Sequence, residues 1–118
     1  MDESRPIFVQ VAEQIENDII AGLMAEESQV PSTNELAAFY RINPATALKG
    51  ITLLVDEGIL YKKRGIGMFV AAGARAKLID QRRDGFAAEY LRPLLAEAAK
   101  LGISAKDLSA MIDKEGSK

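Results

Sequence analysis

The sequence contains neither cysteine nor histidine among its 118 residues. Without cysteine the chain forms no disulfide and has no thiolate, and without both residue types the usual zinc sites are excluded. The missing histidine also removes the commonest general base near neutral pH, and no nucleophile–base pair is visible. No nucleotide, metal or flavin motif is present either. We therefore expect neither an enzyme nor a bound cofactor.

Long apolar runs are also missing. No stretch reaches the length of a membrane-spanning helix, and the first residues, M-D-E-S-R-P, do not resemble a signal peptide. We therefore expect a cytoplasmic protein with no membrane partner. Nearly half of the residues, 48%, are apolar, which is enough for a packed core in one domain or in a small domain with an appendage.

An excess of positive charge is absent too. The formal net charge is −2, and residues 1–72 carry six Lys/Arg against ten Asp/Glu, whereas residues 73–118 carry nine against seven. Clustering of basic residues is more informative than their sum when nucleic acid is considered as a partner. The densest basic cluster is Lys62-Lys63-Arg64.

The stretch from Val30 to Gly58 contains two helix starts and one helix stop. Ser32 followed three residues later by Glu35 predicts a capping box. Asn43 before Pro44 predicts a second start, with the asparagine as cap and the proline in the first helical position. Gly58 is suited to end that helix. Two capped helices joined by a tight connection are typical of a helix-turn-helix.

The flanking segments complete a small domain. Residues 6–21 show helical spacing of apolar residues and Gly22 is a suitable stop, while 23–30 reads as a loop. The two helices of the central unit are expected at 33 to 39 or 40 and at 44–57. One stripe of the second helix should pack inward, and Gly50 within it should allow close helix packing. The inward stripe is Ala47, Gly50, Ile51 and Leu54. The outward side is Ala45, Thr46, Lys49 and Thr52.

Two short runs, 59–64 and 68–71, surround Gly65-Ile66-Gly67 and predict a β-hairpin. Lys62, Lys63 and Arg64 lead directly into its turn. Beside a helix-turn-helix such a hairpin is a wing, whose cations bind phosphates and whose glycines allow close approach to a groove. By composition alone it also fits a solvated hairpin.

Several motifs in sequence order resemble the GntR family of bacterial transcription regulators over about 65 residues. The matching segments are P-I-F-V-Q-V-A-E-Q-I-E-N-D-I-I-A-G (6–22), V-P-S-T-N-E-L-A (30–37), I-N-P-A-T-A-L-K-G (42–50), D-E-G-I-L-Y (56–61) and K-R-G-I-G-M-F-V (63–70). The short remainder resembles the YtrA-type subfamily, in which a helical C-terminal segment mediates dimerisation and many members are repressors. The resemblance implies a mainly α fold with a small β-hairpin. Residues 1–72 would form a winged helix-turn-helix DNA-binding domain, and residues 73–118 a helical dimerisation segment.

The resemblance also implies a set of DNA-contacting residues. Ser32 would contact a phosphate, Thr46 and Lys49 occupy recognition-helix positions, and the wing residues match the family. The full set is Ser32, Thr33, Asn34, Asn43, Ala45, Thr46, Lys49, Lys63, Arg64, Gly65 and Gly67.

Three positions depart from the family pattern. Asn34 replaces a typical arginine, and Leu48 and Ile66 replace residues that are often polar or basic. Each lost phosphate contact should flatten the salt dependence of binding by roughly 0.9 in log–log slope. Our hypothesis is weaker or more shape-dependent DNA binding, and Leu48 could instead meet a thymine methyl.

Residues 74–101 predict one long helix or a kinked pair, with Pro93 as the kink or restart and Gly102 as the end. Ser104 with Asp107 predicts the start of a short last helix. The long apolar stripe favours a homodimer over a tail that folds back on its own domain. The dimer contacts would include Leu78, Phe86, Tyr90, Leu94 and Leu101. Phe86, Tyr90 and Met111 either line an effector pocket there or are ordinary core.

Together these features predict a sequence-specific DNA-binding transcriptional regulator, a repressor that acts as a homodimer on a palindromic operator of double-stranded DNA. A small-molecule effector is a further candidate partner. The alternative is a winged-helix module that binds a protein and has lost much of its DNA contact. Leu48, Val55, Ile66 and the acidic balance of residues 1–72 favour that alternative.

Overall fold

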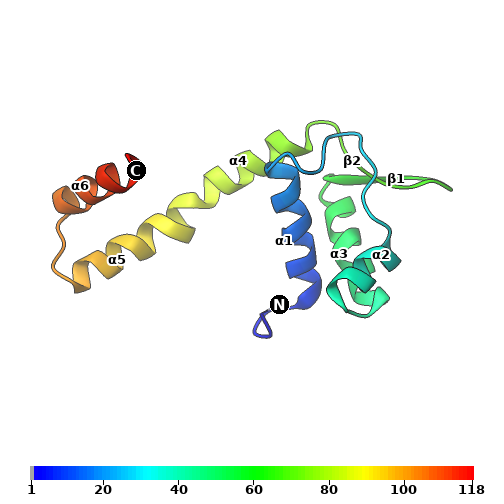
Figure 1. Ribbon diagram of the computed structural model, residues 1–118, viewed down its shortest axis with the longest axis horizontal. Coiled ribbons are helices and arrows are strands. Elements are labelled where there is room, and N and C mark those ends of the chain that lie inside the picture. The colour runs from blue at the N-terminus through cyan, green and yellow to red at the C-terminus, as the bar shows by residue number, and fades with distance from the viewer. Residues whose placement is uncertain (1) are drawn as a thin grey trace. The chain divides into compact units, whose positions relative to one another are not determined.

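The computed structural model describes residues 2–118, so that residue 1 of the segment 1–72 lies outside the description. The chain divides into two compact units, of which the first ends at Asp80 and the second spans Gln81–Lys118. The fold is mainly helical with a two-stranded hairpin, as predicted (Figure 1). The elements are α1 (Ile7–Ile20), α2 (Thr33–Tyr40), α3 (Pro44–Asp56), β1 (Leu60–Lys63), β2 (Gly67–Val70), α4 (Ala74–Phe86), the π-helix η1 (Ala87–Leu91), α5 (Arg92–Lys100) and α6 (Ala105–Gly116).

The core of the first unit forms where α3 packs against both α1 and α2. The buried residues of α3 are Ala47, Gly50, Ile51 and Leu54, which confirms the predicted inward stripe. Gly50 lies where α3 comes close to α1. A Cβ there would lie 2.8 Å from the carbonyl oxygen of Phe8 and 3.3 Å from Cβ of Val11. The prediction that Gly50 permits close packing is therefore confirmed.

The hairpin is antiparallel, and its register pairs Leu60 with Val70 and Lys63 with Gly67. Leu60 and Val70 are buried and anchor it in the core, whereas its far end is exposed. The segment before α2, expected to be a loop, contributes a bridge between Gln29 and Phe69. The amide of Val30 also donates to the carbonyl of Met68 at 2.9 Å. The base of the hairpin is thus held from a second side.

The start of α4 belongs to the first unit. Ala74 and Leu78 are each 1% exposed and lie in the same core cluster as α1 and α3. Leu78 was expected at a dimer contact, and this expectation is corrected because its side chain is already buried within its own chain. The first unit consequently extends to Asp80, whereas the predicted DNA-binding segment ends at residue 72. The roles of segments 1–72 and 73–118 stay predictions.

The second unit contains a continuous helical stretch that passes through Pro93. Proline lacks an amide hydrogen, and its ring clashes with the carbonyl four residues earlier in a regular helix. The π-helix η1 accommodates the proline: the amide of Arg92 donates to the carbonyl of Ala87, five residues earlier. Leu91 before α5 keeps right-handed helical angles and makes no capping bond, so the helix does not restart there.

The end of this helix follows the prediction. Gly102 has a φ of +70°, and the amide of Ile103 donates to the carbonyl of Ala98 at 2.9 Å. This is the usual helix stop that a glycine makes easy. Ser104 then caps α6 by accepting a hydrogen bond from the amide of Asp107 at 3.1 Å. Across residues 2–118, every helix is too short or too polar to span a membrane.

Candidate nucleic-acid interface

Two side-chain caps hold the helix-turn-helix. Ser32 Oγ accepts from the amide of Glu35 at 3.1 Å, and Glu35 Oε1 accepts from the amide of Ser32 at 3.0 Å. The bond from the Ser32 amide, followed by that from its hydroxyl, lowers the pKa of Glu35. Asn43 Oδ1 accepts from the amide of Ala45 at 2.7 Å. Both predicted caps are confirmed, and the N-terminus of each helix is exposed.

The turn between α2 and α3 depends on Arg41, which the sequence analysis did not name. Arg41 adopts the left-handed region with a φ of +56°, and the amide of Ile42 donates to the carbonyl of Ala37 at 2.9 Å. The side chain is exposed, so a cation stands at the turn itself. The sequence signal for Arg41 is its position between the end of one predicted helix and the Asn43 cap of the next. A turn this tight requires one residue with positive φ.

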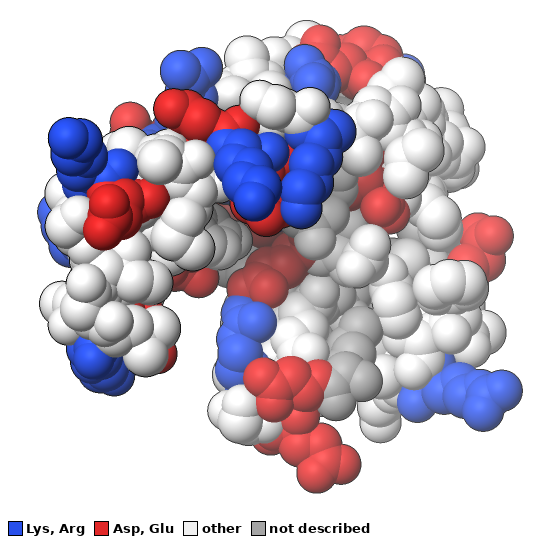
Figure 2. Space-filling model, turned by 60° about the vertical axis from the view of Figure 1, so that its left-hand side comes forward, with Lys and Arg blue, Asp and Glu red and all other residues white. Residues whose placement is uncertain are grey.

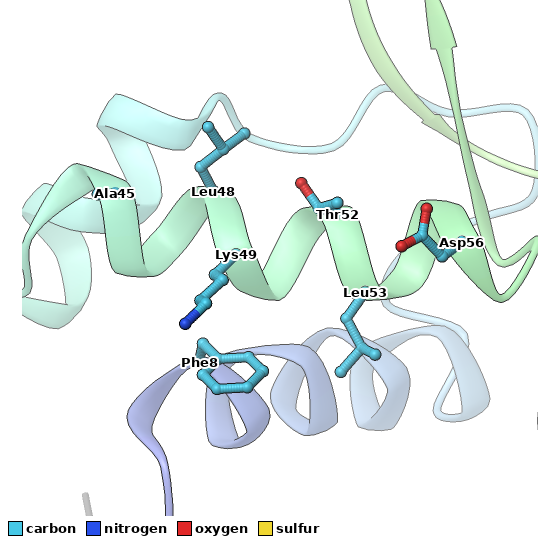
Figure 3. A pocket seen from close by; sticks show the side chains of 7 residues that line it. All are labelled: Phe8, Ala45, Leu48, Lys49, Thr52, Leu53 and Asp56. Carbon is cyan, nitrogen blue, oxygen red and sulfur yellow. The ribbon is translucent and has the colours of Figure 1, made fainter.

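The outward face of α3 carries Ala45, Leu48 and Thr52 on exposed positions, with Thr46 half-buried at its flank. Lys49 does not extend straight outward. Its Nζ lies 5.0 Å from the centroid of the Phe8 ring in α1, and Figure 3 shows the side chain directed toward that ring. Apart from Thr46, these residues border a groove of about 340 Å³; its lining is Phe8, Ala45, Leu48, Lys49, Thr52, Leu53 and Asp56.

The wing is built on an aromatic base. The rings of Tyr61 and Phe69 stack with centroids 5.9 Å apart, and Lys63 Nζ lies 4.4 Å from the centroid of Phe69. The hydroxyl of Tyr61 donates to Glu27 Oε2 at 2.6 Å, and this bond raises the pKa of Tyr61. Lys63 and Arg64 are both exposed, but only the Lys63 side chain is positioned against these rings.

The tip of the wing is braced by Gln29, a residue missed from sequence. Gln29 Nε2 donates to the carbonyl of Ile66 at 3.0 Å. Gly67 has a φ of +144°, and a Cβ there would lie 2.6 Å from the same Nε2 atom. Gly65, with a φ of +79°, supplies the turn. The two glycines are thus required by backbone angle. A side chain at Gly67 would in addition displace the amide end of Gln29 from Ile66.

Comparison with known proteins identifies this arrangement. The family model for bacterial regulatory proteins of the gntR family matches residues 8–70, from α1 to the end of β2. The chain belongs to the GntR family. The family consists of regulatory proteins rather than enzymes, which agrees with the expectation drawn from the missing catalytic residues.

Two relatives resemble this GntR chain over nearly its whole length. It is 29% identical over 109 residues to the HTH-type transcriptional repressor YtrA of Bacillus subtilis, a match covering 92% of this chain and 83% of YtrA. The crystal structure of a GntR-family transcriptional regulator from Bacteroides thetaiotaomicron superposes with a TM-score of 0.76 at 32% identity, covering 94% of this chain and 96% of that one. The winged helix-turn-helix prediction is thereby confirmed.

A third neighbour includes DNA. The DNA-binding domain of AraR in complex with operator ORX1 superposes with a TM-score of 0.55 at 35% identity, covering 60% of this chain and 87% of that domain. The AraR structure is a DNA-binding domain, so it is compared with the winged domain and not with the C-terminal helices.

The predicted DNA-contacting residues all lie in the winged domain of this GntR chain. They lie at the capped start of α2 (32–34), at the capped start of α3 (43–49) and at the turn of the wing (63–67). Cations are sparse among them, and Arg5 forms an ion pair with Glu13 of α1. Figure 2 shows basic and acidic side chains next to one another on the face it presents. Within residues 30–70 the cations are Arg41 at the turn, Lys49 on α3, and Lys62, Lys63 and Arg64 in the wing.

The second unit exposes large apolar side chains. Phe86, Tyr90, Leu94 and Leu101, all predicted dimer contacts, have exposed fractions of 57%, 62%, 42% and 66%. The rings of Phe86 and Tyr90 lie 5.3 Å apart. Met111, proposed with them for an effector pocket, is 50% exposed. Within the chain these residues are surface rather than core.

Proposed function

We propose that this chain is a sequence-specific DNA-binding transcriptional repressor that acts in the cytoplasm as a homodimer on a palindromic operator. The observation that carries the proposal is the exposed N-terminal half of α3, held by the Asn43 cap between the turn and the wing. Helix-turn-helix proteins insert this part of the second helix into the major groove. The similarity to YtrA, a repressor, and to the operator-bound AraR domain supports this assignment.

The surrounding groups have the chemistry of phosphate contacts. The exposed hydroxyl of Ser32 accepts its capping bond, and it can turn its hydrogen from the Glu35 carboxylate to a phosphate oxygen. The guanidinium of Arg64 lies at the turn of the wing, the ammonium of Lys63 lies over the Phe69 ring, and Arg41 lies at the turn between α2 and α3. These groups orient the protein on the duplex, whereas α3 contacts the bases.

The second unit supplies the proposed dimer contact. Its exposed leucines and aromatic rings form an apolar surface of the kind that marks protein interfaces. Two copies related by a two-fold axis would present two α3 helices to half-sites about 34–36 Å apart, one turn of DNA. An effector pocket beside Phe86, Tyr90 and Met111 remains a proposal within this interface.

The direct test is selection of bound sites from random duplex DNA, followed by binding measurements on the selected site. An enriched inverted repeat is the expected result. Sedimentation should give a dimer for the wild type and a monomer for Leu94→Glu, and Leu94→Glu should bind the full repeat no better than a half-site. Leu23→Glu is the matched control, because Leu23 is a 78% exposed leucine of the first unit.

The same experiment tests a second candidate function, the binding of a protein partner. Leu48 on α3 is 49% exposed and Ile66 on the wing is 62% exposed. These apolar side chains would suit a winged-helix module that binds a protein. Such a module would show no binding to mixed-sequence DNA even at low salt. Salt-sensitive binding to mixed DNA, with an enriched motif, favours the repressor.

A further inference from the structure

One stripe of α3 faces outward without cationic or amide groups. Ala45, Leu48 and Thr52 follow one another at helical spacing on exposed positions. At 1.5 Å per residue they extend over about 10 Å, which equals about three base-pair steps of 3.4 Å. Figure 3 shows Leu48 and Thr52 on the side of α3 away from Phe8. The stripe therefore has the length to contact several consecutive base pairs.

The chemistry of this stripe limits which bases it can distinguish. In the major groove, arginine and lysine pair with guanine, asparagine and glutamine pair with adenine, and apolar groups contact the methyl of thymine. The stripe offers the methyl of Ala45, the isobutyl group of Leu48 and the methyl and hydroxyl of Thr52. The nearest cation, Lys49, is directed to the Phe8 ring on the α1 side.

Charge also determines which part of α3 enters the groove. Asp56, at the C-terminal end of α3, repels phosphates, whereas the N-terminal end carries the partial positive charge of the helix. The N-terminal half, which holds Ala45 and Leu48, is thus the half that approaches the bases. Leu48 is its largest exposed apolar side chain and is 49% exposed.

We propose that Leu48, flanked by Ala45 and Thr52, contacts thymine methyl groups in the major groove and thereby determines thymine at the facing positions of each operator half-site. This inference rests on the proposed DNA-binding function and specifies the base chemistry of the same site. It makes Leu48 a specificity-determining residue. It also assigns Lys49 to sequence-independent attraction rather than to guanine recognition.

The test uses uracil, which is thymine without its methyl group. After selection of the preferred duplex, each thymine is replaced singly by uracil, and binding of the full chain is measured at constant salt. Burial of one methyl group corresponds to about a fourfold change in affinity. We expect a loss of about three- to fivefold at the one or two positions that face Leu48, and no change at the other thymines.

Protein variants then assign the effect to a side chain. Leu48→Ala should bind the thymine and uracil duplexes equally at those positions, because the interacting partner of the methyl is gone. Leu23→Ala, the same substitution at an exposed leucine outside α3, should keep the uracil penalty. Lys49→Met should weaken binding to all sequences alike and leave the penalty unchanged. Thermal unfolding of each variant checks that it folds.

The outcomes distinguish a failure of DNA binding from a failure of the methyl contact. If no duplex binds at any salt, the proposed function itself is wrong and the inference with it. If the protein binds its selected site but uracil has no effect at any position, DNA binding stands and the methyl contact is refuted. A uracil penalty that persists in Leu48→Ala, or a selected guanine whose preference is lost in Lys49→Met, would refute the assignment to Leu48.

Discussion

Replacement of Gly50 by alanine is expected to destabilise the first unit by about 1–2 kcal/mol. The added Cβ would lie 2.8 Å from the carbonyl oxygen of Phe8 and 3.3 Å from Cβ and Cγ1 of Val11. The nearest atom belongs to the backbone of α1 and cannot rotate away, so α1 and α3 must move apart. Overpacking of this kind costs about 1–3 kcal/mol. We expect a cost in the upper part of this range because the nearest contact is with the backbone. Alanine returns up to about 1 kcal/mol through its helix propensity.

Gly85 in α4 provides the matched control. Apart from its chain neighbours and the backbone of its own helix, no described atom lies within 4 Å of a Cβ built there. Gly85→Ala therefore keeps the favourable propensity without the steric cost, and we expect it to stabilise the protein by up to about 1 kcal/mol. The two identical substitutions should thus change stability in opposite directions.

The assay is thermal and urea unfolding followed by circular dichroism at one fixed protein concentration, since the proposed dimerisation would make stability depend on concentration. For a unit of this size, 1 kcal/mol corresponds to a shift in Tm of about 4–8 °C. If Gly50→Ala were as stable as the wild type or more so, α1 and α3 could not approach each other as closely as described. A crystal structure of the variant would then show where the methyl is accommodated.

Three further predictions concern the caps, the wing and the turn. The lowered pKa of Glu35 means that its contribution is fully present above its usual value of 4.5 and is lost as the pH falls through the lower folded value. Glu35→Gln keeps the capping box, so its thermal stability should fall less than that of the wild type on acidification. Arg64→Ala should weaken binding to all DNA sequences and reduce the slope of log K against log salt by about 0.9. Arg41→Gly should raise the free energy of unfolding by about 0.5–1 kcal/mol in urea titrations, since the left-handed conformation costs a non-glycine residue about 1–2 kcal/mol and glycine costs about 0.5–1 kcal/mol in chain entropy.

Each of these predictions has an outcome that contradicts it. An unchanged acid profile in Glu35→Gln would mean that its carboxylate is not bound to Ser32 in solution. For Arg64, the control is Lys114→Ala in the last turn of α6; an equal loss of slope in both variants would indicate a general charge effect. A destabilised Arg41→Gly would show that the arginine side chain stabilises the turn more than the backbone angle costs.

The sequence predicted those parts of the fold that depend on neighbouring residues. The caps at Ser32, Asn43 and Ser104 each need a partner within three positions, and all three formed. The stop at Gly102 likewise depends on one backbone angle. Local chemistry of this kind is visible in the sequence because both partners stand in the same short window.

Interactions between distant segments were not predictable in this way. The periodic spacing of apolar residues in α4 predicts that Leu78 is buried, but it does not predict which surface covers it. In the structure, the core of the first unit covers Leu78. The brace from Gln29 to Ile66 joins residues 37 positions apart. The direction of Lys49 depends on where α1 places Phe8. For the site, sequence therefore indicated the elements and the residue types, and the structure was needed for the direction of the side chains.

The π-helix η1 has a consequence for how this chain is aligned with its relatives. Phe86, Tyr90, Leu94 and Ala98 recur at steps of four residues. In a regular α-helix, at about 100° per residue, each step overshoots a full turn by about 40°, so three steps would displace the stripe by about 120°. A turn closed by the bond from Arg92 to Ala87, five residues apart, holds one residue more and reduces this drift. The segment thus acts as a one-residue insertion, and a relative one residue shorter between Phe86 and Arg92 can present the same face on an ordinary α-helix. We therefore expect length changes in this tail to be tolerated best at that turn.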